Sequence, residues 1–179
     1  AAAFALRLAA ASGARRAELA ALRYEGIRDG VMLIDQQVVP DRSKPADDPG
    51  RYVCGPTKTI NRRLVTLDET TLRLLAELRL QRQMFTPWVF GTDECTPAPD
   101  RIGWWWSRAR RIAGIDPKWR LHDLRHFAAT QAIAGGHDVR TVAARLGHAD
   151  PSMTMRVYAH AVAGRDRLIA DTMASVLGG

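Results

Sequence analysis

Six polar residues of this chain are of the types that could transfer a phosphoryl group: Arg15, Lys58, His122, Arg125, His148 and Tyr158. A phosphodiester under attack needs positive donors around its oxygens, a nucleophile in line and an acid for the leaving oxygen. Arginines and histidines can hold the oxygens, and a tyrosine can attack the phosphorus. Such a set supplies all three functions without a metal, so the sequence predicts neither a metal site nor a cofactor.

His122, Arg125 and His148 each have two interpretations. His122 and Arg125 stand three residues apart on an expected helix, so they share one face and could reach the same phosphate. The pair could equally be an ordinary surface pair. His148 follows Gly147 at an expected helix end, where an imidazolium could simply interact with the helix dipole.

Arg15, Lys58 and Tyr158 are equally ambiguous when taken singly. Arg15 precedes Glu18 by three residues, which is also the spacing of a solvated ion pair on a helix. Lys58 is one of only three lysines, and unlike arginine it can give up a proton near neutral pH. It could also be a flexible side chain on a hairpin, and Tyr158 could be a packing aromatic.

The residue pattern predicts an α+β fold that is mainly α-helical, with a small antiparallel sheet near the N-terminal third. Asp68 and Asp100 are expected to cap two of the helices. The helices are expected at about 1–11, 14–23, 68–83, 100–112, 121–134, 138–146, 151–158 and 165–177. The strands are expected at 31–34, 37–39, 52–54 and 62–67, with a polar loop over 40–50.

Three consecutive tryptophans, Trp104 to Trp106, fall inside one expected helix. Consecutive helical positions point about 100° apart, so the three rings cannot all face one core. We expect two of them to pack in the core and at least one to meet an interface, DNA or the rim of the core.

Composition indicates an ordinary globular chain with a basic surface. The 179 residues carry a net charge of +7, which fits a polyanionic partner or a merely basic enzyme. Cys54 and Cys95 lie far apart, which argues against a zinc site or a disulfide scaffold and favours the cytoplasm. No apolar run is long enough to span a membrane. The chain begins abruptly in an expected helix and is interpreted as part of something longer.

The motifs, in their order along the chain, resemble the catalytic domain of the tyrosine recombinase (phage integrase) family. They are SGARRAEL from Ser12, TK at 57–58, HDLRH from His122, LGH from Leu146, and Tyr158. The resemblance runs from Ser12 to about His160 and implies that residues 1–179 form one catalytic domain. Members usually carry a helical DNA-binding domain before this one, and we expect that domain to be missing here.

The resemblance implies a role for each candidate residue in cleaving DNA. Arg15 and Arg125 would clamp the non-bridging oxygens of the scissile phosphate, and His148 would add a hydrogen bond. Tyr158 would attack the phosphorus and form a covalent 3′-phosphotyrosyl link. Lys58 would protonate the departing 5′ oxygen.

The remaining residues are given supporting roles by the same resemblance. His122 would assist proton transfer around the tyrosine, and Glu18 would orient its neighbours. Four further residues are expected to contact DNA: Arg16, Arg62, Arg63 and His126.

The expected partner is double-stranded DNA, and the expected location is the cytoplasm, with the nucleoid. The last helix, about 165–177, would join subunits into a tetramer on DNA or fold back on its own domain. Three other functions remain open: a type IB topoisomerase that relaxes supercoils, a non-catalytic basic DNA-binding domain, and a metal-dependent nuclease.

Overall fold

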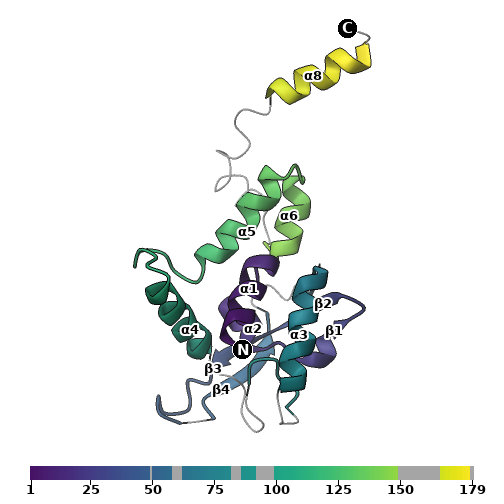
Figure 1. Ribbon diagram of the computed structural model, residues 1–179. Coiled ribbons are helices and arrows are strands. Elements are labelled where there is room, and N and C mark those ends of the chain that lie inside the picture. The colour runs from purple at the N-terminus through teal and green to yellow at the C-terminus, as the bar shows by residue number, and fades with distance from the viewer. Residues whose placement is uncertain (49, 58–61, 82–85, 92–98, 149–165, 178–179) are drawn as a thin grey trace.

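The computed structural model describes residues 1–48, 50–57, 62–81, 86–91, 99–148 and 166–177 (Figure 1). Its helices are α1 (Ala2–Ser12), α2 (Arg16–Ala20), α3 (Glu69–Gln81), α4 (Pro99–Ile112), α5 (Asp123–Ala134), α6 (Val139–Leu146) and α8 (Asp166–Leu177). A short 3-10 turn, η1 (Tyr24–Gly26), precedes the strands. The strands are β1 (Ile27–Arg28), β2 (Val31–Ile34), β3 (Gln36–Pro40), β4 (Tyr52–Pro56) and β5 (Arg63–Thr66). The mainly helical fold with antiparallel strands is therefore confirmed. The helix expected at 151–158 lies outside the described residues.

The strands form two small antiparallel sheets where a single one was expected. One sheet has the order β1-β2-β5, with Met32 opposite Val65, and the other is the hairpin β3-β4. The sequence prediction missed β1, because two residues are too few to show the alternation that marks a strand. Along β5, Arg63 and Val65 are buried while Leu64 and Thr66 are exposed. The pleat thus turns an arginine inward and a leucine outward, which matters for the site below.

Helix α1 runs through the middle of the molecule, with α3, α4, α5 and the strands around it (Figure 1). Its buried face carries Phe4 and Leu8, and Phe4 packs on Phe90 with ring centroids 5.8 Å apart. Phe90 in turn meets Trp105 of α4 edge-on at 6.1 Å. A smaller apolar cluster of Ala129, Ile133, Val142 and Leu146 holds α5 against α6. The core therefore fixes the positions of α2, α5 and α6 through α1.

The tryptophan run is divided by burial. Trp105 belongs to the core, Trp106 is half-buried and Trp104 is 58% exposed. The Nε1–H of Trp106 donates a hydrogen bond to the carbonyl of Trp119 at 3.1 Å. The expectation that the three rings cannot share one core is confirmed, but only one of them is fully buried.

Several helix ends follow their expected caps and others do not. Asp68 accepts a hydrogen bond from the Thr71 backbone N–H at 3.0 Å, which confirms it as a cap. Asp100 lies inside the first turn of α4, which begins at Pro99, so its expected capping role is wrong. The helix expected over 14–23 stops at Ala20, because the chain beyond it pairs with another segment: the Val89 N–H donates to the carbonyl of Leu22 at 2.9 Å.

Helix α8 is drawn apart from the other helices in Figure 1. The side chains of residues 171–177 on it are exposed, among them Met173, Val176 and Leu177. Within the described part of the chain, no helix is both long and apolar enough to cross a membrane.

Candidate active site

The turn between α1 and α2 presents Arg15. Gly13 ends α1 with a φ of +64°, a conformation that glycine adopts without strain. A Cβ at this position would also lie 2.4 Å from the Leu146 Cδ2, so only glycine lets the turn approach α6. Arg15 then takes an extended conformation as the N-cap of α2. The turn therefore places Arg15 against the C-terminal end of α6.

Glu18 fixes the direction of the Arg15 side chain. One carboxylate oxygen accepts the Arg15 backbone N–H at 2.7 Å, and the other accepts the Arg15 Nη1 at 2.9 Å. The Arg15 Nη2 lies 3.4 Å from the carbonyl oxygen of Gly147. Glu18 is almost fully buried, whereas the Arg15 side chain is 35% exposed. The Arg15 guanidinium is thus held by protein and still accessible to a ligand.

Arg63 occupies the other side of the Glu18 carboxylate. Its Nη1 and Nη2 donate to the two Glu18 oxygens at 3.0 and 2.6 Å, and its Nε donates to the carbonyl of Arg145 at 3.0 Å. Burial would raise the pKa of Glu18, but the hydrogen bonds and charge of Arg63, together with Arg15, hold it below its usual value. The expectation that Arg63 contacts DNA is wrong. It is 8% exposed because its partner is the buried Glu18.

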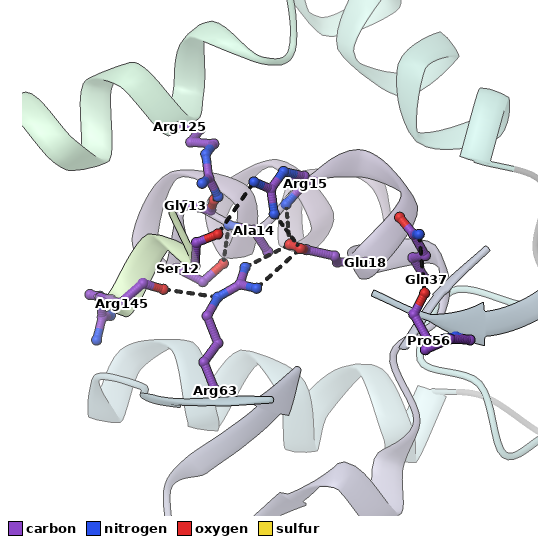
Figure 2. Close-up of polar contacts among 11 residues, drawn as sticks. Ser12, Gly13, Ala14, Arg15, Glu18, Gln37, Pro56, Arg63, Arg125 and Arg145 are labelled. Atoms are coloured by element: carbon purple, nitrogen blue, oxygen red, sulfur yellow. Dashed lines mark hydrogen bonds and ion pairs between the residues drawn. The ribbon is translucent and has the colours of Figure 1, made fainter. Parts of the chain in front are cut away.

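Arg125 reaches the same turn from α5. It is 3% exposed, and its Nη1 donates to the carbonyl of Gly13 at 2.6 Å. Figure 2 shows Arg15, Arg63 and Arg125 converging from three different elements on the turn of Ser12 to Ala14 and on Glu18. Three permanently charged groups thus gather around a single buried carboxylate. Positive charge is left over in a partly dry environment, which favours an anion.

His148 stands beside these arginines at the end of α6. Gly147 adopts a φ of +72°, and the His148 N–H donates to the carbonyl of Ala143 at 3.0 Å, so the helix ends in a Schellman motif. Burial lowers the pKa of His148 to about 4, and the charges of Arg125, Arg15 and Arg63 add to the effect. The imidazole is therefore neutral near pH 7, with one ring N–H that can donate a hydrogen bond.

His122 lies directly before α5, at the exposed edge of the same region. Partial desolvation lowers its pKa, followed by the charges of His126, Arg125 and Arg15. The His122 and His126 rings meet edge-on with centroids 5.0 Å apart. The same two arginines thus influence His122 and His148, which brings four of the six candidate residues around one space. Within the described residues, no cluster of three His, Cys, Asp or Glu side chains could hold a metal ion.

The remaining candidates are distributed as follows. Lys58 and Tyr158 lie outside the described residues. Arg16 and Arg62 are exposed, and Arg16 forms an ion pair with Asp100 at 3.1 Å. An open cleft of about 510 Å³ begins at Arg15 and His122 and continues toward α4.

Arg145 was not predicted as part of this region. Its Nη2 donates to the carbonyl of Ala11 at 3.0 Å and to the carbonyl of Thr66 at 3.1 Å. It thereby joins α6 to the end of α1 and to β5, and so sets the position of His148. A basic residue in the last turn of a helix was the only sequence signal, and many surface residues share it.

Comparison with known proteins gives one consistent family. The model of the phage integrase family matches residues 1–165. The tyrosine recombinase XerD of Caulobacter vibrioides is 34% identical over 129 residues, which cover 66% of this chain and 41% of the relative. The integrase of Mycobacterium phage L5 is 42% identical over 60 residues, covering 34% of this chain and 16% of the phage protein. The chain spans less than half of the length of these relatives.

Solved structures show the same fold. The Tn1549 transposon integrase, solved in complex with transposon right end DNA, superposes with a TM-score of 0.79 at 17% identity, over 96% of this chain and 58% of that one. The catalytic domain of bacteriophage HP1 integrase superposes with a TM-score of 0.58 at 22% identity, over 88% of this chain and 73% of that one.

Proposed function

Since the chain belongs to the phage integrase family, we propose that residues 1–179 are the catalytic domain of a site-specific DNA recombinase. In this proposal it cleaves and rejoins DNA strands during integration, excision or resolution, without a metal. The observation that carries the proposal is the convergence of Arg15, Arg125, His122 and His148 on one accessible space beside a buried Glu18.

The proposed reaction is a transesterification. The Tyr158 hydroxyl attacks the scissile phosphorus, the bond from phosphorus to the 5′ oxygen breaks, and a 3′-phosphotyrosyl ester forms. The tyrosine loses one proton and Lys58 gives one to the departing 5′ oxygen, so the step is balanced. Attack by a 5′ hydroxyl of another strand reverses these events and reseals the DNA.

The described residues would stabilise the charge that develops on the phosphate. Arg15 and Arg125 are held by Glu18 and by the Gly13 carbonyl before any substrate binds. A fixed donor of this kind contributes about 2.7–4 kcal/mol to transition-state stabilisation. His148 can donate a hydrogen bond as a neutral imidazole, and His122 can move a proton near the tyrosine.

Double-stranded DNA is the proposed partner, supported by the net charge of +7 and by the exposed Arg16 and Arg62. We further propose that α8 joins subunits into a tetramer on DNA, because its exposed side chains include Met173, Val176 and Leu177. Folding of α8 onto its own domain is the alternative. The proposed location is the cytoplasm, with the nucleoid.

Trapping of a covalent complex tests the proposal. Wild-type protein is incubated with nicked suicide duplexes that carry the flanks of its gene, and a protein–DNA adduct is sought under denaturing conditions. We expect an adduct with the wild type and with the control Tyr24→Phe, and none with Tyr158→Phe. An adduct that survives in Tyr158→Phe contradicts the assignment of the nucleophile.

The other functions give different outcomes in the same experiment. A type IB topoisomerase would relax a plasmid that lacks any specific site. A non-catalytic domain would bind DNA in a salt-sensitive way that Tyr158 does not affect, and would form no adduct. A metal-dependent nuclease would lose its activity in EDTA.

A further inference from the structure

The cleft of about 510 Å³ beside the candidate active site has a basic lining that the reaction itself does not need. Arg15 and His122 form its boundary with the active site. Beyond them it is lined by Arg16 of α2, Arg110 of α4 and Arg120, which lies just before α5. None of the residues described along its wall is an aspartate or a glutamate. The cleft is therefore suited to an anion that continues from the one held by Arg15.

Gly103 gives one of these arginines its place. A Cβ at this position of α4 would lie 3.3 Å from the Arg16 Nη1. Glycine inside a helix costs roughly 0.5–1 kcal/mol relative to alanine. The helix therefore gives up some stability at the point where the Arg16 guanidinium lies against it. The ion pair of Arg16 with Asp100 is exposed on both sides, so it is weak and can be exchanged for a phosphate oxygen.

Arg110 is oriented before any ligand binds. Its Nη1 donates to the carbonyls of Pro117 and Trp119, the latter at 2.9 Å. A guanidinium has five N–H donors in a planar fork, and these two bonds use only one of its nitrogens. The loop that holds Arg110 is also held by Trp106, through its bond to the Trp119 carbonyl. Arg110 is thus a positioned donor rather than a freely moving surface charge.

We propose that this cleft binds a second backbone phosphate of the DNA strand, next to the phosphate that is cut. The proposal rests on the proposed function, since it takes the Arg15 site to hold the scissile phosphate. Arg16, Arg110 and Arg120 hold the neighbouring phosphate, and Arg15 stands between the two sites. Binding at both sites sets the register of the strand, so that the scissile phosphorus lies in line with its nucleophile.

Single neutral phosphates test this inference. A series of suicide duplexes carries one methylphosphonate at each position near the cleavage site, which removes one backbone charge at a time. Equilibrium binding is measured with Tyr158→Phe protein, so that cleavage does not interfere. We expect one flanking position to weaken binding by about 10-fold or more, as for the loss of a hydrogen bond to a charged group.

The variant Arg120→Gln should lose about as much affinity on unmodified DNA, and nothing further on DNA that is neutral at that position. Arg110→Gln should behave in the same way, with thermal unfolding as the check that its loop is intact. Arg111→Gln is the matched control, because Arg111 is exposed on α4 and does not line the cleft. It should remain fully sensitive to the methylphosphonate. The slope of log affinity against log salt should fall by about one for each cleft variant.

The outcomes separate this inference from the proposed function. If Arg120→Gln and the methylphosphonate weaken binding independently at every position, the cleft proposal is overturned, even when the wild type forms its adduct. Wild-type protein that forms no adduct contradicts the proposed function, while coupling between Arg120 and one phosphate still supports the cleft site. Failure to bind DNA at all overturns both.

Discussion

Glu18 offers the strongest test of how the site is held together. Its carboxylate is 1% exposed and accepts four hydrogen bonds, two from Arg15 and two from Arg63. The change Glu18→Gln removes the charge and turns an NH₂ group toward guanidinium donors. The Arg63 guanidinium, itself 8% exposed, then stays buried without a counter-charge.

Breaking a buried ion pair on one side costs about 3–5 kcal/mol. For a domain of this size that corresponds to a fall in Tm of roughly 6–20 °C. Urea unfolding followed by tryptophan fluorescence measures the free energy directly. Glu25→Gln is the matched control, because Glu25 is 63% exposed and pairs with Arg23 at the surface. Loss of such a surface pair should change stability by at most about 1 kcal/mol.

A double-mutant cycle shows whether the loss belongs to the pair. Arg63→Met alone leaves Glu18 with Arg15, and the double variant removes the uncompensated Arg63 charge. We expect the double variant to be less destabilised than the sum of the single ones, by about 0.5–3 kcal/mol. A cost of less than about 1 kcal/mol for Glu18→Gln, or strictly additive costs, would refute the reasoning.

Two further predictions concern α6 and its end. Because the pKa of His148 is about 4 in the folded protein and near 6.5 when unfolded, the unfolded state binds more protons between these values. The free energy of unfolding should therefore fall as pH drops from about 6.5 to about 4, and more shallowly in His148→Gln; equal slopes in urea unfolding would contradict this. Gly147→Ala should cost at least about 1–2 kcal/mol, because φ is +72° and the new Cβ would lie 2.7 Å from the Arg63 Nη1. Gly55→Ala, whose Cβ would meet no atom within 4 Å, is its control, and equal costs for the two variants would refute the explanation.

The sequence predicted those parts of the fold that depend on local signals. Asp68 caps α3 and Gly147 ends α6 because short-range hydrogen bonds and backbone conformation decide both positions. It failed where distant segments decide the structure. The end of α2 depends on pairing between Leu22 and Val89, 67 positions away, which no local pattern reveals.

The same limit applies to the site. The residue types of Arg15, His122, Arg125 and His148 and their order could be recognised, but Arg63 was taken for a DNA contact. A basic residue on a strand looks exposed until its partner is known, and Glu18 lies 45 residues earlier in the chain. Arg145 was missed for a related reason, since its acceptors are backbone carbonyls and carry no sequence signal.

The central claim is that Tyr158 forms a covalent bond to DNA in a metal-independent site. Mass spectrometry of the trapped adduct, prepared in EDTA and digested with protease and nuclease, tests it most directly. We predict a nucleotide joined through its 3′ phosphate to the peptide that contains Tyr158. A nucleotide on any other residue, or an adduct that forms only when a divalent metal is supplied, would contradict the account.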